Sequence, residues 1–183
     1  MPRRLSNLTH LGHLGVGALC SLMLVASSPP PLRGRVKAII VTRIHVSKGD
    51  RTMDLYDGST LVATYAVAVG RGGAGHKKME GDNVTPVGHY HVVTRVPSHL
   101  RVFMRLDYPN ADDRARFEEL KRHGELPKNA TIGGEIGIHG EPPEVKPFNK
   151  FDYGSHGCVV LENAEIDEVS RMVPDGTPVD IDD

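Results

Sequence analysis

Two short motifs in the C-terminal third of the chain carry residue types suited to covalent catalysis. They are Ile138-His139-Gly140 and Ser155-His156-Gly157-Cys158. A cysteine attacks as its thiolate, and a neighbouring imidazole can take up its proton near neutral pH. The glycine in each motif lets backbone and substrate approach closely. We therefore predict that Cys158 is a nucleophile and that His139 is its general base.

An acyl-transfer site also needs donors for the oxyanion of the tetrahedral intermediate. We expect the backbone N–H groups of Gly157 and Cys158 to supply them, because glycine permits the required turn. His139 should lie at the end of a strand, from where its ring can reach a neighbouring strand end. We expect a backbone carbonyl near Gly140 to orient the second imidazole nitrogen.

The same residues leave two other interpretations open. One is a zinc site of His139, His156 and Cys158 with a fourth ligand, such as Asp152 or another histidine, although no Cys-x-x-Cys or His-Glu-x-x-His spacing supports it. The other is a binding module in which Cys158 is buried and inert. Thiol reactivity separates these interpretations, because a catalytic cysteine should have a depressed pKa and be alkylated faster than a model thiol at about pH 6–7.

Composition bounds the class of protein. The chain has 183 residues, a net charge of −1, 39% hydrophobic and 25% charged residues, which fits one globular domain with a sizeable core. The near-neutral charge argues against a nucleic-acid partner. Thirteen prolines and twenty glycines favour a β-rich fold over a helix bundle.

The N-terminus resembles a targeting segment. Arg3 and Arg4 precede an apolar run over 11–26, which is too short for a comfortable membrane span, and small residues follow at 25–28. We expect a signal peptide or N-terminal anchor over 1–28, a linker over 29–35 and an exported domain over 36–183.

Removal of this leader would also remove Cys20. Cys158 would then be the only thiol of the mature chain. A lone cysteine in an oxidising compartment has no intramolecular partner and marks a candidate reactive group.

Alternating and β-branched residues predict most of the secondary structure. Two helices are expected, one over 111–122 capped by Asn110 and one after a cap at Asn163 that runs to Val173. The expected strands cover 36–46, 52–56, 61–69, 87–96, 102–108, 135–138, 159–161 and 178–181.

Two long loops remain. The glycine-rich loop over 70–86 is either functional or a disordered surface hairpin. The loop over 141–154 contains three prolines and three aromatic residues, and it is either a lid over a substrate groove or an ordinary connection.

At these residues the chain resembles the L,D-transpeptidase catalytic domain family, the YkuD-type fold. The resemblance is strongest in the histidine and cysteine motifs and spans roughly residues 36 to 181. Further matching segments are Glu80-Gly81-Asp82, Thr85-Pro86-Val87-Gly88, residues 107–114, residues 163–168 and residues 173–178.

The resemblance implies a mainly β fold, sandwich or barrel-like, with one or two short helices. In members of this family, the cysteine attacks the L-centre carbonyl of the diamino acid in a peptidoglycan stem tetrapeptide and expels D-alanine. An amine or water then resolves the acyl-enzyme. Cys158 matches the nucleophile, His139 the base and Gly157 the oxyanion turn. The supporting residues would be Ser155, His156 and Gly140.

The resemblance implies no cofactor and no metal. It implies peptidoglycan stem peptides as substrates, an envelope lipoprotein as a further acceptor or substrate, and a place in the periplasm or cell envelope of a bacterium. We also expect a monomer. Val160 departs from the family, because many members carry an arginine two residues after the cysteine. The activity therefore stays open. The chain could be a transpeptidase, a hydrolase (an L,D-carboxypeptidase or a lipoprotein-releasing amidase), or a non-catalytic wall-binding domain.

Overall fold

The computed structural model describes residues 38–142 and 154–183. The predicted leader and linker, and most of the predicted lid, lie outside these residues. None of the helices in the described ranges is long and apolar enough to cross a membrane. The elements in chain order are β1 (Arg43–Ser47), β2 (Thr52–Asp57), β3 (Thr60–Ala66), β4 (Gly88–Ser98), β5 (Arg101–Leu106), α1 (Ala111–Arg122), β6 (Gly137–His139), β7 (Val159–Val160), α2 (Asn163–Met172) and β8 (Pro178–Asp182).

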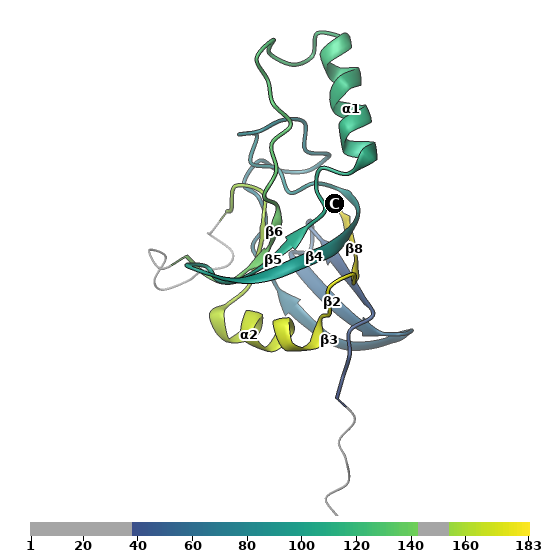
Figure 1. Cartoon of the computed structure of the whole chain (residues 1–183), viewed down its shortest axis with the longest axis vertical. Coiled ribbons are helices and arrows are strands. Elements are labelled where there is room, and N and C mark those ends of the chain that lie inside the picture. The colour runs from purple at the N-terminus through teal and green to yellow at the C-terminus, as the bar shows by residue number, and fades with distance from the viewer. Residues whose placement is uncertain (1–37, 143–153) are drawn as a thin grey trace, which may run out of the picture. The chain divides into compact units, whose positions relative to one another are not determined.

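The strands form one strongly curved sheet in the order β3-β2-β1-β8-β4-β5-β6-β7 (Figure 1). The register of β4 against β5 shifts between Val92 and Thr94, and such a bulge lets the sheet bend at this point. Beyond β3 the chain reaches the other end of the sheet, where Ala68 pairs with Val160. The two edges of the sheet thus meet, which confirms the predicted mainly β, barrel-like fold.

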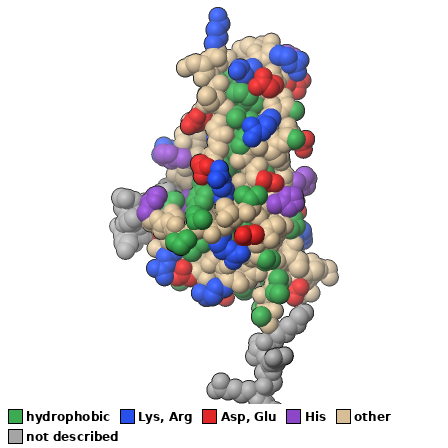
Figure 2. Space-filling view, viewed as in Figure 1, with side chains coloured by type: hydrophobic (Ala, Val, Ile, Leu, Met, Phe, Trp, Pro, Cys, Tyr) green, Lys and Arg blue, Asp and Glu red, His purple; other side chains and the backbone are tan. Residues whose placement is uncertain are grey.

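A core of buried apolar side chains fills the space enclosed by the sheet. It includes Ile44, Leu55, Tyr90, Met104 and Ile138, one from each of five strands. Figure 1 shows α1 and α2 on opposite sides of the strands. On the outer surface, acidic and basic side chains are interspersed over the face drawn in Figure 2, in line with the near-zero net charge.

Helix α1 has the predicted start. The side chain of Asn110 accepts hydrogen bonds from the backbone N–H groups of Asp112 (3.0 Å) and Asp113 (3.1 Å), and the Asp113 carboxylate accepts one from the Asn110 N–H (3.1 Å). This reciprocal capping box satisfies donors that a helix N-terminus otherwise leaves unpaired. The Asp113 carboxylate is buried and also accepts a hydrogen bond from the Tyr90 hydroxyl at 3.1 Å. The cap therefore ties α1 to β4.

Helix α2 starts one residue earlier than predicted. Asn163 is its first helical residue and Glu162 is the N-cap, so the predicted Asn163 cap is wrong. The Glu162 N–H donates to the Glu165 carboxylate at 3.0 Å. The inward face of the helix is as expected, because Ile166 and Val169 are buried.

The first predicted strand is too long at its N-terminal end. Residues 38–42 are not in a strand, and β1 begins only at Arg43. The side chains of Ile39 and Ile40 are 48% and 57% exposed, so neither contributes to the core. Their β-branched shape favours a strand only where a pleated, half-buried surface is available, and here it is not.

Candidate active site

The parallel pairing of β6 with β7 brings the two motifs together. Ile138 pairs with Val159 and His139 with Val160, so continuing the register places Cys158 beside Gly137. Residues two apart on a strand point to the same face, so Gly137 and His139 share a face of β6, and the extended register sets Cys158 beside Gly137, which has no side chain. Strand spacing and rise put the Cα atoms of His139 and Cys158 about 8 Å apart. The predicted nucleophile thus directly precedes β7, and the predicted base is the last residue of the adjacent strand β6.

His139 is buried, with 4% of its surface exposed. Its Nδ1 lies 2.7 Å from the Gly140 carbonyl oxygen, which confirms the predicted orienting carbonyl. A carbonyl only accepts, so Nδ1 carries the hydrogen and Nε2 keeps a lone pair in the neutral ring. Burial lowers the pKa of His139, His99 lowers it further, and the bond to Gly140 opposes both. The ring is therefore neutral at pH 7 and can accept a proton.

Phe103 fixes the plane of the His139 ring. The two residues pair across β5 and β6, and their rings stack with centroids 5.9 Å apart and planes 19° apart. A Cβ on Gly137 would lie 2.7 Å from Phe103 Cζ, so the stack requires glycine at that position. Phe103 cannot be identified from the sequence alone, because only the strand register places it against the histidine.

The Cys158 thiol is protonated in this conformation. Its Sγ donates to the Glu135 carbonyl oxygen at 3.6 Å, and Glu135 adopts a φ of +53°, which non-glycine residues seldom do. Burial raises the pKa of Cys158 to about 11, against the stabilising effects of the Gly137 amide and the Lys77 charge. The expectation of a depressed pKa is therefore wrong, because desolvation of the thiolate outweighs its favourable partners.

Ser155 braces the turn that carries the cysteine. Its buried hydroxyl donates to the Cys158 carbonyl oxygen at 2.6 Å and accepts from the Gly157 N–H at 3.0 Å. Gly157 has a φ of +128°, and a Cβ there would lie 2.9 Å from the Val84 carbonyl oxygen, so glycine is required. The Gly157 amide, expected as an oxyanion donor, is engaged with Ser155 instead.

His156 is exposed and points to a different partner. Its Nε2 lies 3.1 Å from the guanidinium of Arg71, in the segment after β3. A guanidinium only donates, so Nε2 of His156 is the accepting nitrogen and is occupied. The supporting role of His156 stays a prediction, and its neighbour Arg71 is not evident from the sequence.

Cys158 opens into a cavity of about 300 Å³, which we call the Cys158 cavity. The glycine-rich loop over 70–86 supplies one wall, which favours the functional interpretation of that loop. The lining residues are Lys77, Glu80, Gly81, Asn83, Gly133, Gly134, Glu135, Ile136, His156 and Cys158.

The Asp82 carboxylate organises this wall. It accepts a hydrogen bond from Lys77 Nζ at 2.5 Å, and it also accepts hydrogen bonds from the backbone amides of Lys78, Met79 and Val84. Although burial acts to raise the pKa of Asp82, these four donors lower it overall, so the group is ionised at pH 7. The loop is thus ordered around one charge rather than being a disordered hairpin.

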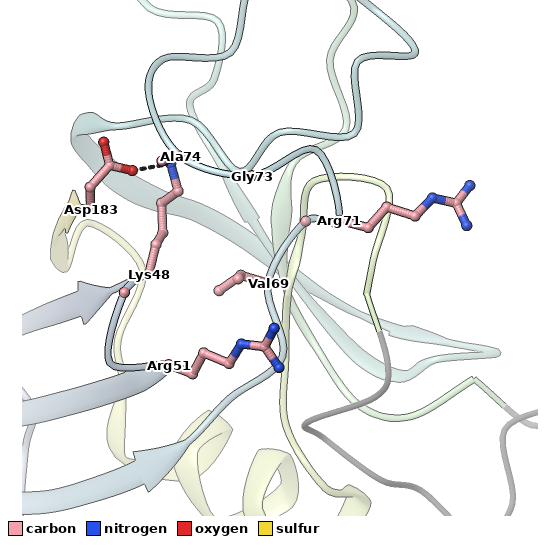
Figure 3. A pocket seen from close by; sticks show the side chains of 9 residues that line it. Lys48, Arg51, Val69, Arg71, Gly73, Ala74 and Asp183 are labelled. Atoms are coloured by element: carbon pink, nitrogen blue, oxygen red, sulfur yellow. Dashed lines mark ion pairs between the residues drawn. The ribbon is translucent and has the colours of Figure 1, made fainter.

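A second cavity of about 300 Å³ lies between the β1–β2 turn and the segment after β3 (Figure 3). Lys48 and Asp183 form an ion pair of 2.6 Å in its wall. Figure 3 shows the Arg71 guanidinium directed away from this pair. That direction agrees with its contact to His156.

The structure does not assemble a metal site from the described ranges. Within 38–142 and 154–183, no group of three or more His, Cys, Asp or Glu side chains is placed to hold a metal ion. Asp152, the fourth ligand considered in the zinc interpretation, lies outside these ranges.

Comparisons with known proteins agree with this geometry. Residues 41–181 match the YkuD family model, described as the L,D-transpeptidase catalytic domain. The Escherichia coli (strain K12) protein "Putative L,D-transpeptidase YafK" is 29% identical over 137 residues, 71% of this chain and 46% of that protein. The Bacillus licheniformis protein "Putative L,D-transpeptidase YkuD" is 29% identical over 139 residues, 76% of this chain and 64% of that protein.

Solved structures share the fold. The helical cell shape determining protein Pgp2 from Campylobacter jejuni has a TM-score of 0.58 at 24% identity, covering 77% of this chain and 47% of that one. Bd1075 from Bdellovibrio bacteriovorus has a TM-score of 0.53 at 25% identity, covering 79% and 48%. The chain spans less than two thirds of the length of each of these relatives. Because the family model matches most of its length, this chain belongs to the L,D-transpeptidase catalytic domain family.

Proposed function

We propose that the protein is a cysteine acyltransferase that acts on peptidoglycan stem tetrapeptides, with Cys158 as nucleophile and His139 as general base. The observation that carries the proposal is the β6–β7 register, which pairs His139 with Val160, two residues after Cys158. The bond from His139 Nδ1 to Gly140 leaves Nε2 as the proton acceptor. Family membership supports the reaction class.

The first half-reaction forms a thioester. As Cys158 Sγ attacks the L-centre carbonyl carbon of the diamino acid, its proton passes to His139 Nε2, and the carbonyl oxygen becomes an oxyanion. We assign the Cys158 backbone N–H as its donor, because the Gly157 amide is engaged with Ser155. The intermediate then expels D-alanine, whose nitrogen takes the proton from His139.

The second half-reaction releases the acyl group. An amine from a second stem peptide attacks the thioester carbonyl and gives a proton to His139, the C–S bond breaks, and the sulfur regains a proton. The products are a cross-link and free enzyme. Water in place of the amine would make the same site a carboxypeptidase.

The setting of the reaction is part of the proposal. The charged and apolar pattern of residues 1–28 supports export to the periplasm or cell envelope. We further propose a monomer, with an envelope lipoprotein as one possible acceptor or substrate class.

Mass spectrometry of the protein incubated with purified disaccharide-tetrapeptide tests the proposal. Loss of D-alanine together with a cross-linked dimer is the expected result, and loss without a dimer identifies a carboxypeptidase. Cys158→Ala and His139→Ala should abolish both products while remaining folded, and the exposed His123→Ala serves as a control for histidine removal. Turnover that persists in Cys158→Ala would overturn the proposed nucleophile.

A further inference from the structure

Lys77 is a buried cation in the wall of the Cys158 cavity. Its side chain is 4% exposed, and lysine is rarely so buried unless it is paired. Its partner is Asp82, with Nζ 2.5 Å from Oδ1. Of this pair, Lys77 is the member that lines the cavity. Lys77 therefore shares the cavity wall with Cys158, while its ammonium group pairs with Asp82.

Asp82 holds this ammonium group in place. Its Oδ2 accepts from the amides of Lys78 (2.7 Å) and Met79 (3.1 Å), and its Oδ1 accepts from the amide of Val84 (3.0 Å) in addition to Lys77. A carboxylate with three backbone donors is fixed by the chain itself. Lys77 Nζ cannot turn out to solvent without giving up a charge-assisted hydrogen bond. The positive charge is therefore preorganised.

Other charged residues line the cavity but are more strongly screened. Glu135 is 71% exposed and pairs with Arg105 at 2.5 Å. Glu80 is exposed and accepts a hydrogen bond from Thr131 at 2.5 Å.

The two histidines near the cysteine add little charge. His156 is exposed and accepts from the Arg71 guanidinium, and the buried His139 is neutral at pH 7. Among the cavity-lining residues, Lys77 thus carries the charge that is best shielded from water.

Shielding decides which charge dominates at the sulfur. At equal distance a Coulomb interaction is about four times stronger at an effective dielectric of about 20 than in water at about 80. The electrostatic balance at Cys158 agrees, because Lys77 lowers the pKa of the thiol more than Glu135 raises it. Burial still outweighs both in the resting state, so the cysteine needs such a charge when it loses its proton.

We propose that Lys77 is an electrostatic positioning residue whose ammonium group, fixed by Asp82, stabilises the negative charge that develops on Cys158 Sγ during proton transfer. It acts through the cavity and does not form a bond to substrate. The inference concerns the thiol alone, so it goes beyond the peptidoglycan reaction and does not depend on it.

Alkylation by iodoacetamide tests this inference in the absence of any peptidoglycan. The full chain is used in a Cys20→Ser background, and the rate of Cys158 modification is followed by mass spectrometry between about pH 7 and pH 9. The variants are Lys77→Gln, which keeps a donor for Asp82 but no charge, and Lys77→Arg, which keeps the charge. The matched control is Lys78→Gln, at the exposed neighbouring lysine.

Lys77→Gln should slow alkylation about tenfold at every pH, which corresponds to a rise of about one unit in the pKa of the thiol. Lys78→Gln should change the rate less than about twofold, since exposed charges contribute little. Lys77→Arg should restore most of the wild-type rate. A merely structural role would instead loosen the cavity and speed alkylation.

Equal rates for Lys77→Gln and Lys78→Gln would overturn the proposal. So would a faster reaction in Lys77→Gln, or unfolding of both Lys77→Gln and Lys77→Met at 25 °C, because each result would assign Lys77 a structural role. If the thiol behaves as expected but the protein leaves disaccharide-tetrapeptide unchanged, the proposed function fails and this inference stands.

Discussion

Gly137→Ala tests how tightly β5, β6 and the His139 ring are packed. A Cβ on residue 137 would lie 2.6 Å from the Met104 carbonyl oxygen, and ordinary contact begins at 3.4 Å. The backbone of β5 would have to retreat by about 0.8 Å, and Phe103 would have to leave its stack on His139. Overpacking of this kind costs about 1–3 kcal/mol in a well-packed interior.

Two readouts follow from this displacement. Differential scanning calorimetry should show a Tm lower by roughly 2–12 °C, since 1 kcal/mol corresponds to about 2–4 °C in a protein of this size. Release of D-alanine should fall about 10- to 100-fold in kcat, because a shift of about 1 Å in a catalytic group costs up to about 100-fold. KM should change little, because residue 137 does not line the Cys158 cavity.

Gly134→Ala is the matched control. Gly134 lines the same cavity, but a Cβ there would meet nothing within 4 Å, so both Tm and kcat should stay near wild type. Phe103→Leu separates the loss of the ring stack from the displacement of the strands, because it removes the stack without forcing the strands apart. It should lower kcat while leaving Tm close to wild type. A Gly137→Ala protein that matches Gly134→Ala in both measurements would refute the reasoning.

Other perturbations have equally definite outcomes. Asn110→Ala removes the cap of α1 and should lower the free energy of unfolding in urea by about 1–2 kcal/mol. Gly157→Ala should abolish turnover and lower Tm, because a φ of +128° costs a non-glycine residue about 1–3 kcal/mol. Since the pKa of His139 lies below 6.5, the acidic limb of kcat/KM should have its midpoint below pH 6.5. In that range the unfolded state binds the extra proton, so the His139 contribution to stability should fall as the pH drops below 6.5. The pKa of Cys158 is about 11 in the folded protein against 9.0 for the ordinary thiol, so the midpoint of its alkylation should fall to about pH 9 in urea. The contribution of the neutral thiol to folding stability should be lost as the pH rises from 9 through 11, because the unfolded thiol ionises first.

Local patterns were sufficient to predict most elements of the fold. Asn110 caps α1 because its own side chain reaches the amides of Asp112 and Asp113, a property that a few neighbouring residues determine. The first strand was overextended because β-branched propensity at Ile39 and Ile40 has no partner strand to support it. The predicted Asn163 cap was wrong because Glu162 is the N-cap, where its N–H donates to the Glu165 carboxylate.

The candidate site also contains features that the sequence predicts and features that it does not. The motif spacing predicted the pair of Cys158 and His139, because their residue types alone suggest a nucleophile and a base. It could not reveal Phe103 or the buried charge of Lys77, which depend on strand register and on a loop folded around Asp82. The direction of the thiol pKa was also out of reach, since it depends on how much solvent the folded chain removes from the sulfur.

The two pKa shifts at the site act together. Burial favours the neutral imidazole of His139 and the neutral thiol of Cys158, so the resting pair is uncharged rather than a thiolate–imidazolium ion pair. A neutral pair suits a reaction in which one proton passes from sulfur to His139 and then to a departing amine. His139 Nε2 must be unprotonated before the attack, and the ring becomes charged only afterwards. In the proposed mechanism, charge appears only when substrate fills the Cys158 cavity, whose wall holds Lys77 bound to Asp82.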